Sequence, residues 1–197
     1  MQYSRKQKHL NNQFVYLMYK RCKMAEKDKI FKGKVKMKGL FDYKNFYEFL
    51  YDYLMDENYD VFERKYQEKV SGDSKDVEIK WECMKEISDY FRFVITIDWL
   101  ILGMKKVKIK KDNQEISMDT GLLEIKFSAL IVKDYENRWE YHPFWKFLRG
   151  IYDRYIIRTR IEQYEERLME EVNEAIAEAK ALLAIETKHE TTKVTEI

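Results

Sequence analysis

Alternating apolar and polar residues between residues 59 and 135 constrain the fold of this chain more than any other feature. A period of two is typical of strands that bury one face and expose the other. Short turn-like segments interrupt the alternation, and strands joined by short turns pair antiparallel. The pattern predicts strands at 59–70, 76–87, 90–102, 105–111, 114–119 and 122–135. The residues expected to face inward are Val77, Ile79, Trp81, Cys83, Phe91, Phe93, Ile95, Ile97, Trp99, Leu123, Ile125, Phe127, Ala129 and Ile131.

One strand and one helix precede this run, and a long helix follows it. Residues 34–41 alternate as a half-buried strand, and Asp42 caps a helix that is expected to end at Asn58. The chain has one proline and six glycines, so few positions interrupt its elements. A long helix is therefore predicted over residues 143–185. The apolar stripe expected along its distal half is Ile161, Tyr164, Leu168, Val172, Ala175 and Ala179.

The predicted fold class is α+β, with an antiparallel sheet of about six to seven strands gripping the long C-terminal helix. From residue 34 to about residue 183, the order of elements resembles the helix-grip fold of the START/Bet v 1-like (SRPBCC) superfamily. The resemblance rests on element order and size, without a sequence motif, and one helix stands where that superfamily usually has two. It implies a hydrophobic cavity between sheet and helix. The superfamily includes lipid and sterol carriers, cyclase-like enzymes and co-chaperones, so the fold alone does not choose a function.

Charge is spread unevenly along the chain, although its formal net charge is only +2. Residues 1–38 hold twelve basic and two acidic residues, a net charge of +10, whereas residues 162–186 have a net charge of −6. Such asymmetry indicates either an arm that binds polyanions or an arm that packs on an acidic helix. We divide the chain into a basic N-terminal arm with a short amphipathic helix (1–33), a helix-grip domain (34–185) and a disordered tail (186–197).

A cytoplasmic location is expected from features at the N-terminus and from the cysteines. No apolar run approaches the length of a membrane span, and the N-terminus lacks the apolar core of a signal peptide. Cys22 and Cys83 have no metal-type spacing, which fits a reducing compartment. Met24 is a plausible second start, so residues 1–23 are expected to be dispensable for folding. The Lys-, Glu- and Ile-rich composition is similar to that of small archaeal-type proteins.

Seven residues are the candidates for ligand binding. Two aromatic pairs would line the cavity, Trp81 and Trp99 from the sheet and Tyr152 and Tyr155 from the helix. The polar groups that would orient a ligand are Arg64, Glu68 and Arg158. Alternation places Phe62, Arg64, Tyr66, Glu68 and Val70 on one face of their strand. The alternatives are that Arg64 and Glu68 lie in solvent on an edge strand and that Arg158 pairs with a glutamate.

Catalytic chemistry has little support in the sequence. The three histidines lie far apart in the chain, and no glycine-rich phosphate loop is present. Asp98, between Ile97 and Trp99, is either a buried acid with a raised pKa or an ordinary solvent-facing carboxylate. A cyclase-like enzyme working through Asp98 is the weakest of the hypotheses. No metal and no cofactor are expected.

The sequence therefore favours a non-enzymatic domain that binds an apolar small molecule in a sheet/helix cavity or acts as a protein-interaction module. The alternative is a nucleic-acid or ribosome-associated protein. It would use the basic arm and the arginine-rich segment 149–160 to bind a polyanion. Self-association through the C-terminal helix, as a homo-oligomer, is also expected because that helix would extend beyond a small sheet.

Overall fold

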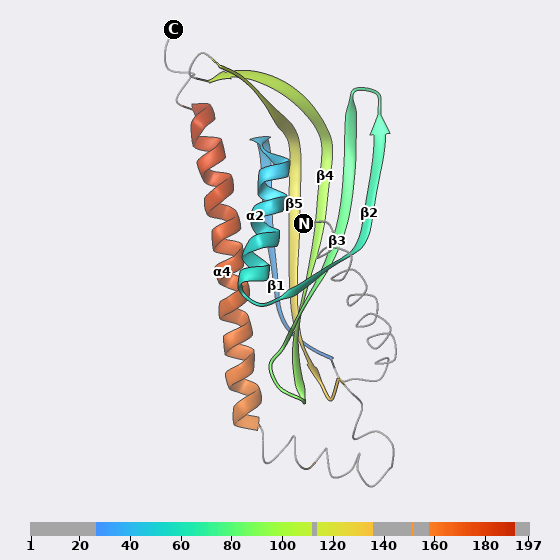
Figure 1. Ribbon diagram of the computed structural model, residues 1–197, viewed down its shortest axis with the longest axis vertical. Coiled ribbons are helices and arrows are strands. Elements are labelled where there is room, and N and C mark those ends of the chain that lie inside the picture. Colours follow the sequence, from blue (N-terminus) through green and yellow to red (C-terminus); the bar gives the residue numbers. More distant parts are fainter. Residues whose placement is uncertain (1–26, 112–113, 136–150, 152–157, 192–197) are drawn as a thin grey trace, which may run out of the picture.

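The structure is a computed structural model, and it describes residues 27–111, 114–135, 151 and 158–191 (Figure 1). The chain forms an α+β domain in which helices pack on one face of an antiparallel sheet, as predicted. The described elements are β1 (Lys27–Phe41), α2 (Tyr43–Asp56), β2 (Asp60–Ser71), β3 (Ser74–Glu86), β4 (Phe91–Lys111), β5 (Gln114–Lys133) and α4 (Arg158–Thr191).

The sheet has five strands in the order β1-β5-β4-β3-β2, and every neighbouring pair is antiparallel. The prediction of six to seven strands was wrong because two of the expected turns lie inside continuous strands. Gly103 has a φ of 62°, and a bulge between Leu102 and Lys105 lets β4 continue through it. The Gly103 N–H donates to Asp76 Oδ1 at 2.7 Å. Gly121 lies opposite Gly39 in register, so β5 also continues where a turn was expected.

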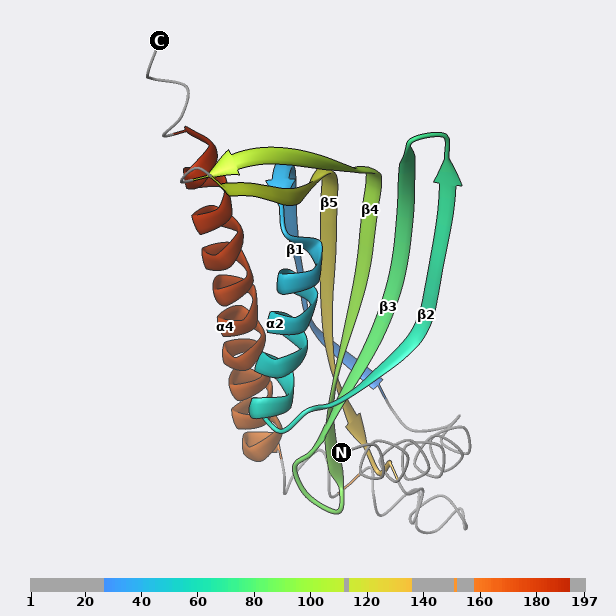
Figure 2. The same ribbon diagram turned by 45° about the horizontal axis from the view of Figure 1, so that its top comes forward.

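The inner face of the sheet holds the main core. All fourteen residues predicted to face inward from β3, β4 and β5 are buried, which confirms the alternation in this part of the chain. Figures 1 and 2 show α2 and α4 side by side over this face. The same figures show the distal ends of β4 and β5 curving toward the C-terminal end of α4. The apolar layer between sheet and helices is therefore the main source of stability.

Local sequence explains how each helix is placed. The Asp42 side chain accepts a hydrogen bond from the Asn45 N–H at 3.1 Å, which confirms the predicted N-cap of α2. Asn58, with a φ of 63°, follows the C-terminus of α2. In β1, a Cβ atom added to Gly33 would lie 2.6 Å from the Ile176 side chain, so glycine permits α4 to pack closely on β1. The α2 residues Phe46, Leu50 and Leu54 and the α4 residues Leu168, Val172, Ala175, Ile176, Ala179 and Leu183 are buried.

A polar network also fixes α4 to the sheet. Glu171 accepts hydrogen bonds from Tyr59 Oη at 2.6 Å, Lys85 Nζ at 3.0 Å and Arg167 Nε at 3.0 Å. Burial by itself raises the pKa of the Glu171 carboxyl, but these hydrogen bonds outweigh burial and leave the pKa below its usual value. Burial and the contact with Glu171 raise the pKa of Tyr59, so this hydroxyl stays protonated. The network is thus a structural anchor that joins β3 and the residue just before β2 to α4.

Several expected boundaries differ from the structure or lie outside the described residues. β1 begins at Lys27 rather than at residue 34, and α4 extends to Thr191, beyond the expected start of a disordered tail at residue 186. The amphipathic helix of the arm, at residues 10–25, and most of the segment 143–157 lie outside the described residues. None of the described helices is long and apolar enough to cross a membrane.

Candidate functional site

Aromatic side chains gather on the inner face of the sheet where α2 approaches β2 and β3. We call this group the aromatic cluster, and its members are Tyr43, Tyr47 and Tyr51 of α2, Tyr66 of β2, Trp81 of β3 and Trp99 of β4. The ring centroids of Trp81 and Trp99 are 5.0 Å apart, and those of Tyr47 and Trp81 are 4.7 Å apart. Both pairs meet edge to face, an arrangement that aromatic quadrupoles favour.

The secondary structure explains why these rings meet. Tyr43, Tyr47 and Tyr51 recur every four residues, so they share one stripe of α2. Trp99 lies opposite Ile79 in the ladder, which makes Trp81 its diagonal neighbour on the same face. Exposure increases outward from the two buried indoles to Tyr51, which is 37% exposed, and Tyr66, which is 48% exposed. The cluster therefore joins the core to the solvent.

The two buried indoles carry hydrogen-bond donors that lack acceptors. Among the described residues, neither Trp81 Nε1 nor Trp99 Nε1 has a hydrogen-bond partner. The Trp81 N–H lies beside the Tyr47 hydroxyl without reaching hydrogen-bond geometry, so Trp99 is the clearer case. A buried donor without a partner costs about 1–3 kcal/mol. A molecule that brings its own acceptor would satisfy the Trp99 donor.

Polar groups form the outer rim of the aromatic cluster. Tyr47 Oη donates to Glu63 Oε2 at 2.8 Å, and burial together with this bond raises the pKa of Tyr47. Tyr66 Oη donates to Glu68, which also accepts from Lys75 Nζ at 3.1 Å. Burial and the bond to Glu68 raise the pKa of Tyr66 to about 12, whereas the bonds from Tyr66 and Lys75 lower the pKa of Glu68. The hydroxyls of Tyr47 and Tyr66 thus stay protonated at neutral pH, and the Glu68 carboxyl beside Tyr66 stays ionised.

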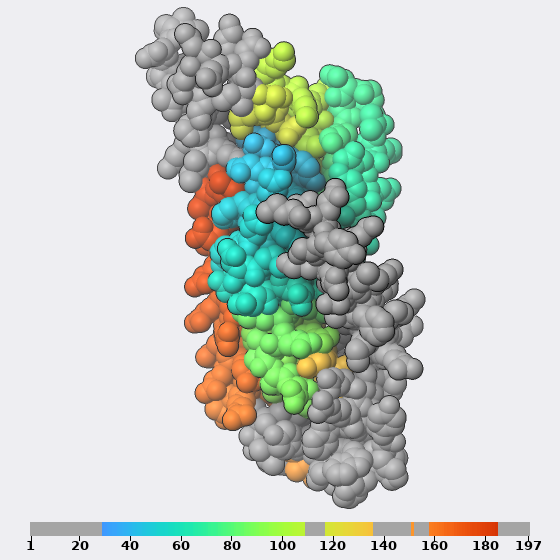
Figure 3. Space-filling view, in the orientation of Figure 1, coloured from blue at the N-terminus to red at the C-terminus, as the bar shows by residue number. Residues whose placement is uncertain are grey.

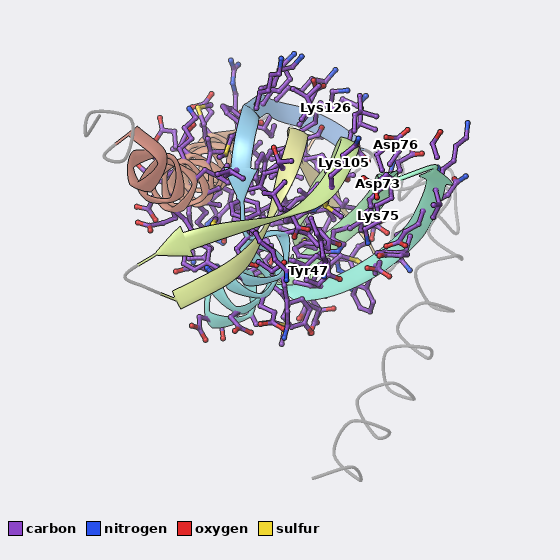
Figure 4. The ribbon with its side chains drawn as sticks, turned by 90° about the horizontal axis from the view of Figure 1, so that it is seen from above. Tyr47, Asp73, Lys75, Asp76, Lys105 and Lys126 are labelled. Atoms are coloured by element: carbon purple, nitrogen blue, oxygen red, sulfur yellow. The ribbon has the colours of Figure 1, made fainter. Side chains whose placement is uncertain are left out.

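The views from outside the molecule place this rim. Figure 3 shows α2 at the surface between α4 and the β2–β3 hairpin. Figure 4 shows Tyr47 and Lys75 on the inner side of the curved sheet, and Lys126 and Asp76 on its outer side. The far end of β2 is open on its inner side, because Val70 remains 71% exposed. Solvent therefore reaches the tyrosines from the β2–β3 side.

The structure separates Arg64 from Glu68. A bulge between Glu63 and Lys65 shifts the pairing of β2. Even-numbered residues therefore face outward before the bulge and inward after it. Arg64 Nε pairs with Glu82 Oε2 at 2.5 Å on the outer face, whereas Glu68 lies opposite Val77 on the inner face. The expectation that Phe62, Arg64, Tyr66, Glu68 and Val70 share one face was therefore wrong.

The remaining predicted site residues have different outcomes. Trp81 and Trp99 are brought together on the inner face, as expected. Tyr152 and Tyr155 lie outside the described residues. Arg158 is exposed on α4, where its Nε lies 3.3 Å from Glu162 Oε1, the alternative considered for it.

Sequence reasoning missed the tyrosines of the aromatic cluster. Tyr43, Tyr47 and Tyr51 recur every four residues, and this spacing was the available signal. It was overlooked because the larger apolar stripe expected on this helix accounts for the helix by itself. That stripe is Phe46, Phe49, Leu50, Tyr53 and Leu54, of which Phe46, Leu50 and Leu54 are buried. Tyr66 gave no signal of this kind, since its position depends on the bulge.

Asp98 is the other acid that the sequence singled out. It lies on the outer face with its side chain 48% exposed and pairs with Lys80 Nζ at 3.4 Å. This is the solvent-facing alternative rather than a buried acid. Across the part of the chain that the structure describes, no group of three or more His, Cys, Asp or Glu side chains is arranged to hold a metal ion. No protein-family model, curated protein or solved structure matches the chain.

Proposed function

We propose that this domain binds a small, flat, largely apolar molecule at the aromatic cluster, without catalysing a reaction. We also propose that its sheet and helices are a helix-grip arrangement of the START/Bet v 1-like type, with β1 and β2 at opposite edges and α4 over the inner face. The observation that carries the proposal is the buried Trp99 indole N–H, which has no acceptor among the described residues and lies beneath partly exposed tyrosines.

The surroundings define the chemistry of the ligand. Rings from three strands and one helix offer edges and faces against which a flat molecule stacks. A carbonyl or ring nitrogen on that molecule would accept from the Trp99 N–H and recover the cost of its burial. Two acidic side chains at the rim, Glu63 and Glu68, disfavour an anionic ligand by like-charge repulsion. A neutral aromatic molecule with one acceptor fits these groups best.

The test uses Nile red, a neutral aromatic dye with a carbonyl acceptor, in a fluorescence titration of the full chain. Tyr66→Ala removes an exposed ring of the cluster and spares the buried indoles. Gln67→Ala is the matched control, since Gln67 is the exposed neighbour on the other face of β2. We expect Tyr66→Ala to weaken dye binding about fivefold, because an aromatic pair contributes about 1 kcal/mol, and Gln67→Ala to leave it unchanged.

A second measurement asks whether the protein already carries such a molecule. Native mass spectrometry of the purified chain should show a small-molecule adduct that organic extraction removes. An adduct-free mass, together with Nile red emission that does not respond to the protein, would contradict the proposal. Equal weakening by Tyr66→Ala and Gln67→Ala would show that the dye binds elsewhere, and would also count against it.

A further inference from the structure

A second surface, on the opposite face of the sheet, has a different chemistry. The outward positions of β1 between residues 32 and 38 are all lysine, and each of these side chains is exposed. In register, Lys34 lies opposite Lys126 of β5, which is also exposed. We call Lys32, Lys34, Lys36, Lys38 and Lys126 the lysine row. Figure 4 shows nitrogen-tipped side chains extending outward from β1 near Lys126.

Few carboxylates balance this row. Glu124 is held by Lys36 at 2.6 Å and by Lys126 at 3.0 Å, and hydrogen bonds from these lysines lower its pKa to about 2. Elsewhere on the outer face, Glu78 pairs with Lys65 and Asp98 pairs with Lys80, so these two acids already have basic partners. Within the described ranges, Lys32, Lys34 and Lys38 take part in no ion pair. The row therefore keeps an excess of positive charge.

We propose that the lysine row binds the phosphate backbone of a nucleic-acid duplex. Alternate residues of a strand are about 6.8 Å apart, so four lysines form a straight line of charge about 20 Å long. Such a line matches about six base pairs, because successive phosphates of one strand advance about 3.4 Å along the duplex axis. The lysine row itself offers no ring for base stacking, so contacts would involve the backbone and be independent of sequence.

Edge protection alone does not account for the row. Lysine on an edge strand discourages pairing with another sheet, and β1 is an edge strand. However, like charges at neighbouring positions of a sheet repel, and Lys34 faces Lys126 directly across the β1–β5 ladder. A polyanion relieves this repulsion, and release of its counterions drives binding.

The experiment measures binding of a fluorescent mixed-sequence DNA duplex by anisotropy over a series of salt concentrations, using the full chain. The variant Lys32→Gln/Lys34→Gln/Lys38→Gln removes the three lysines without ion pairs and spares Glu124 and its partners. The charge-matched control Lys44→Gln/Lys65→Gln/Lys80→Gln removes three lysines that are paired with acids. Circular dichroism checks that both variants fold.

We expect the row variant to bind at least about tenfold more weakly at about 0.1 M salt, with the slope of log K against log salt reduced by about 2.7. The control should keep most of the affinity and of the slope. Equal losses in both variants would show an effect of net charge alone and overturn the proposal. So would the absence of duplex binding by the wild-type chain at low salt. Binding to vesicles containing phosphatidylserine but not to the duplex would assign the row to a membrane surface, and would also overturn it.

Discussion

The two faces of the same sheet are built from different side chains and serve different ends. The inner positions of β4 hold the buried Phe93, Ile95, Ile97 and Trp99. Its outer positions hold Val94, which is buried in a smaller apolar cluster, followed by Thr96 and the ion-paired Asp98. Burial of apolar area is the main driving force of folding, and exposed ion pairs contribute little. The inner face therefore accounts for most of the stability, and the outer face is freer to carry charge for binding.

The largest expected change in stability comes from removing a buried ring of the inner face. Phe93 is fully buried beneath the helices, so Phe93→Ala should lower the free energy of unfolding by about 3–5 kcal/mol. Thr96→Ala, three residues along β4 on the outer face, should cost less than about 1 kcal/mol. Urea denaturation followed by circular dichroism measures both. Similar losses in the two variants would show that the outer face contributes as much as the inner face.

A smaller effect is expected at the anchor between α4 and the sheet. Glu171→Gln removes the charge that accepts from Tyr59, Lys85 and Arg167, and leaves the half-buried Lys85 ammonium without its carboxylate. We expect a loss of about 1.5–3 kcal/mol, the range for hydrogen bonds to charged groups. Glu174→Gln is the control. Glu174 lies three residues further along α4 and is exposed, so its substitution should change stability little. If Glu171→Gln leaves the free energy of unfolding unchanged, Glu171 does not anchor α4 to the sheet.

The same carboxylate should make stability depend on pH. The pKa of Glu171 is lower in the folded chain than its usual value of 4.5, so the unfolded chain takes up the proton first on acidification. The contribution of ionised Glu171 to the free energy of unfolding is complete above the pKa that Glu171 has in the unfolded chain. It is lost as pH falls through the pKa that Glu171 has in the folded chain. The difference in unfolding free energy between wild type and Glu171→Gln should therefore shrink below about pH 4.5. A difference that stays constant down to acid pH would contradict this assignment.

The smallest effect is expected at the bulge of β4, between Leu102 and Lys105. Gly103 has a φ of 62°, and nothing lies within 4 Å of the position that a Cβ atom would take. Gly103→Ala should therefore cost about 1 kcal/mol through backbone strain alone. Gly103→Asn should cost less, since asparagine tolerates this conformation. Thermal unfolding distinguishes the two, and equal costs would point to lost flexibility rather than to strain.

Much of the fold could be predicted from local patterns. The inward residues of β3, β4 and β5 and the N-cap at Asp42 are as expected. Of the stripe expected on α4, Leu168, Val172, Ala175 and Ala179 are buried, and Ile161 and Tyr164 are partly buried. The number of strands was not, because Gly103 and Gly121 look like turn residues while the ladders beside them continue. A glycine permits a turn or a bulge equally well, and only pairing with the neighbouring strand decides between them.

In the candidate site, too, local patterns predicted some features and strand pairing decided the others. Alternation alone determined that Trp81 and Trp99 face inward, since the side-chain period of a strand is local. The face of Tyr66 and Glu68 depended on one bulge between Glu63 and Lys65, which exists only once β2 has paired with β3. The bond between Tyr59 and Glu171 joins residues 112 positions apart. Local periodicity fixes which side chains share a face within an unbroken strand, whereas register and helix packing decide which of them meet.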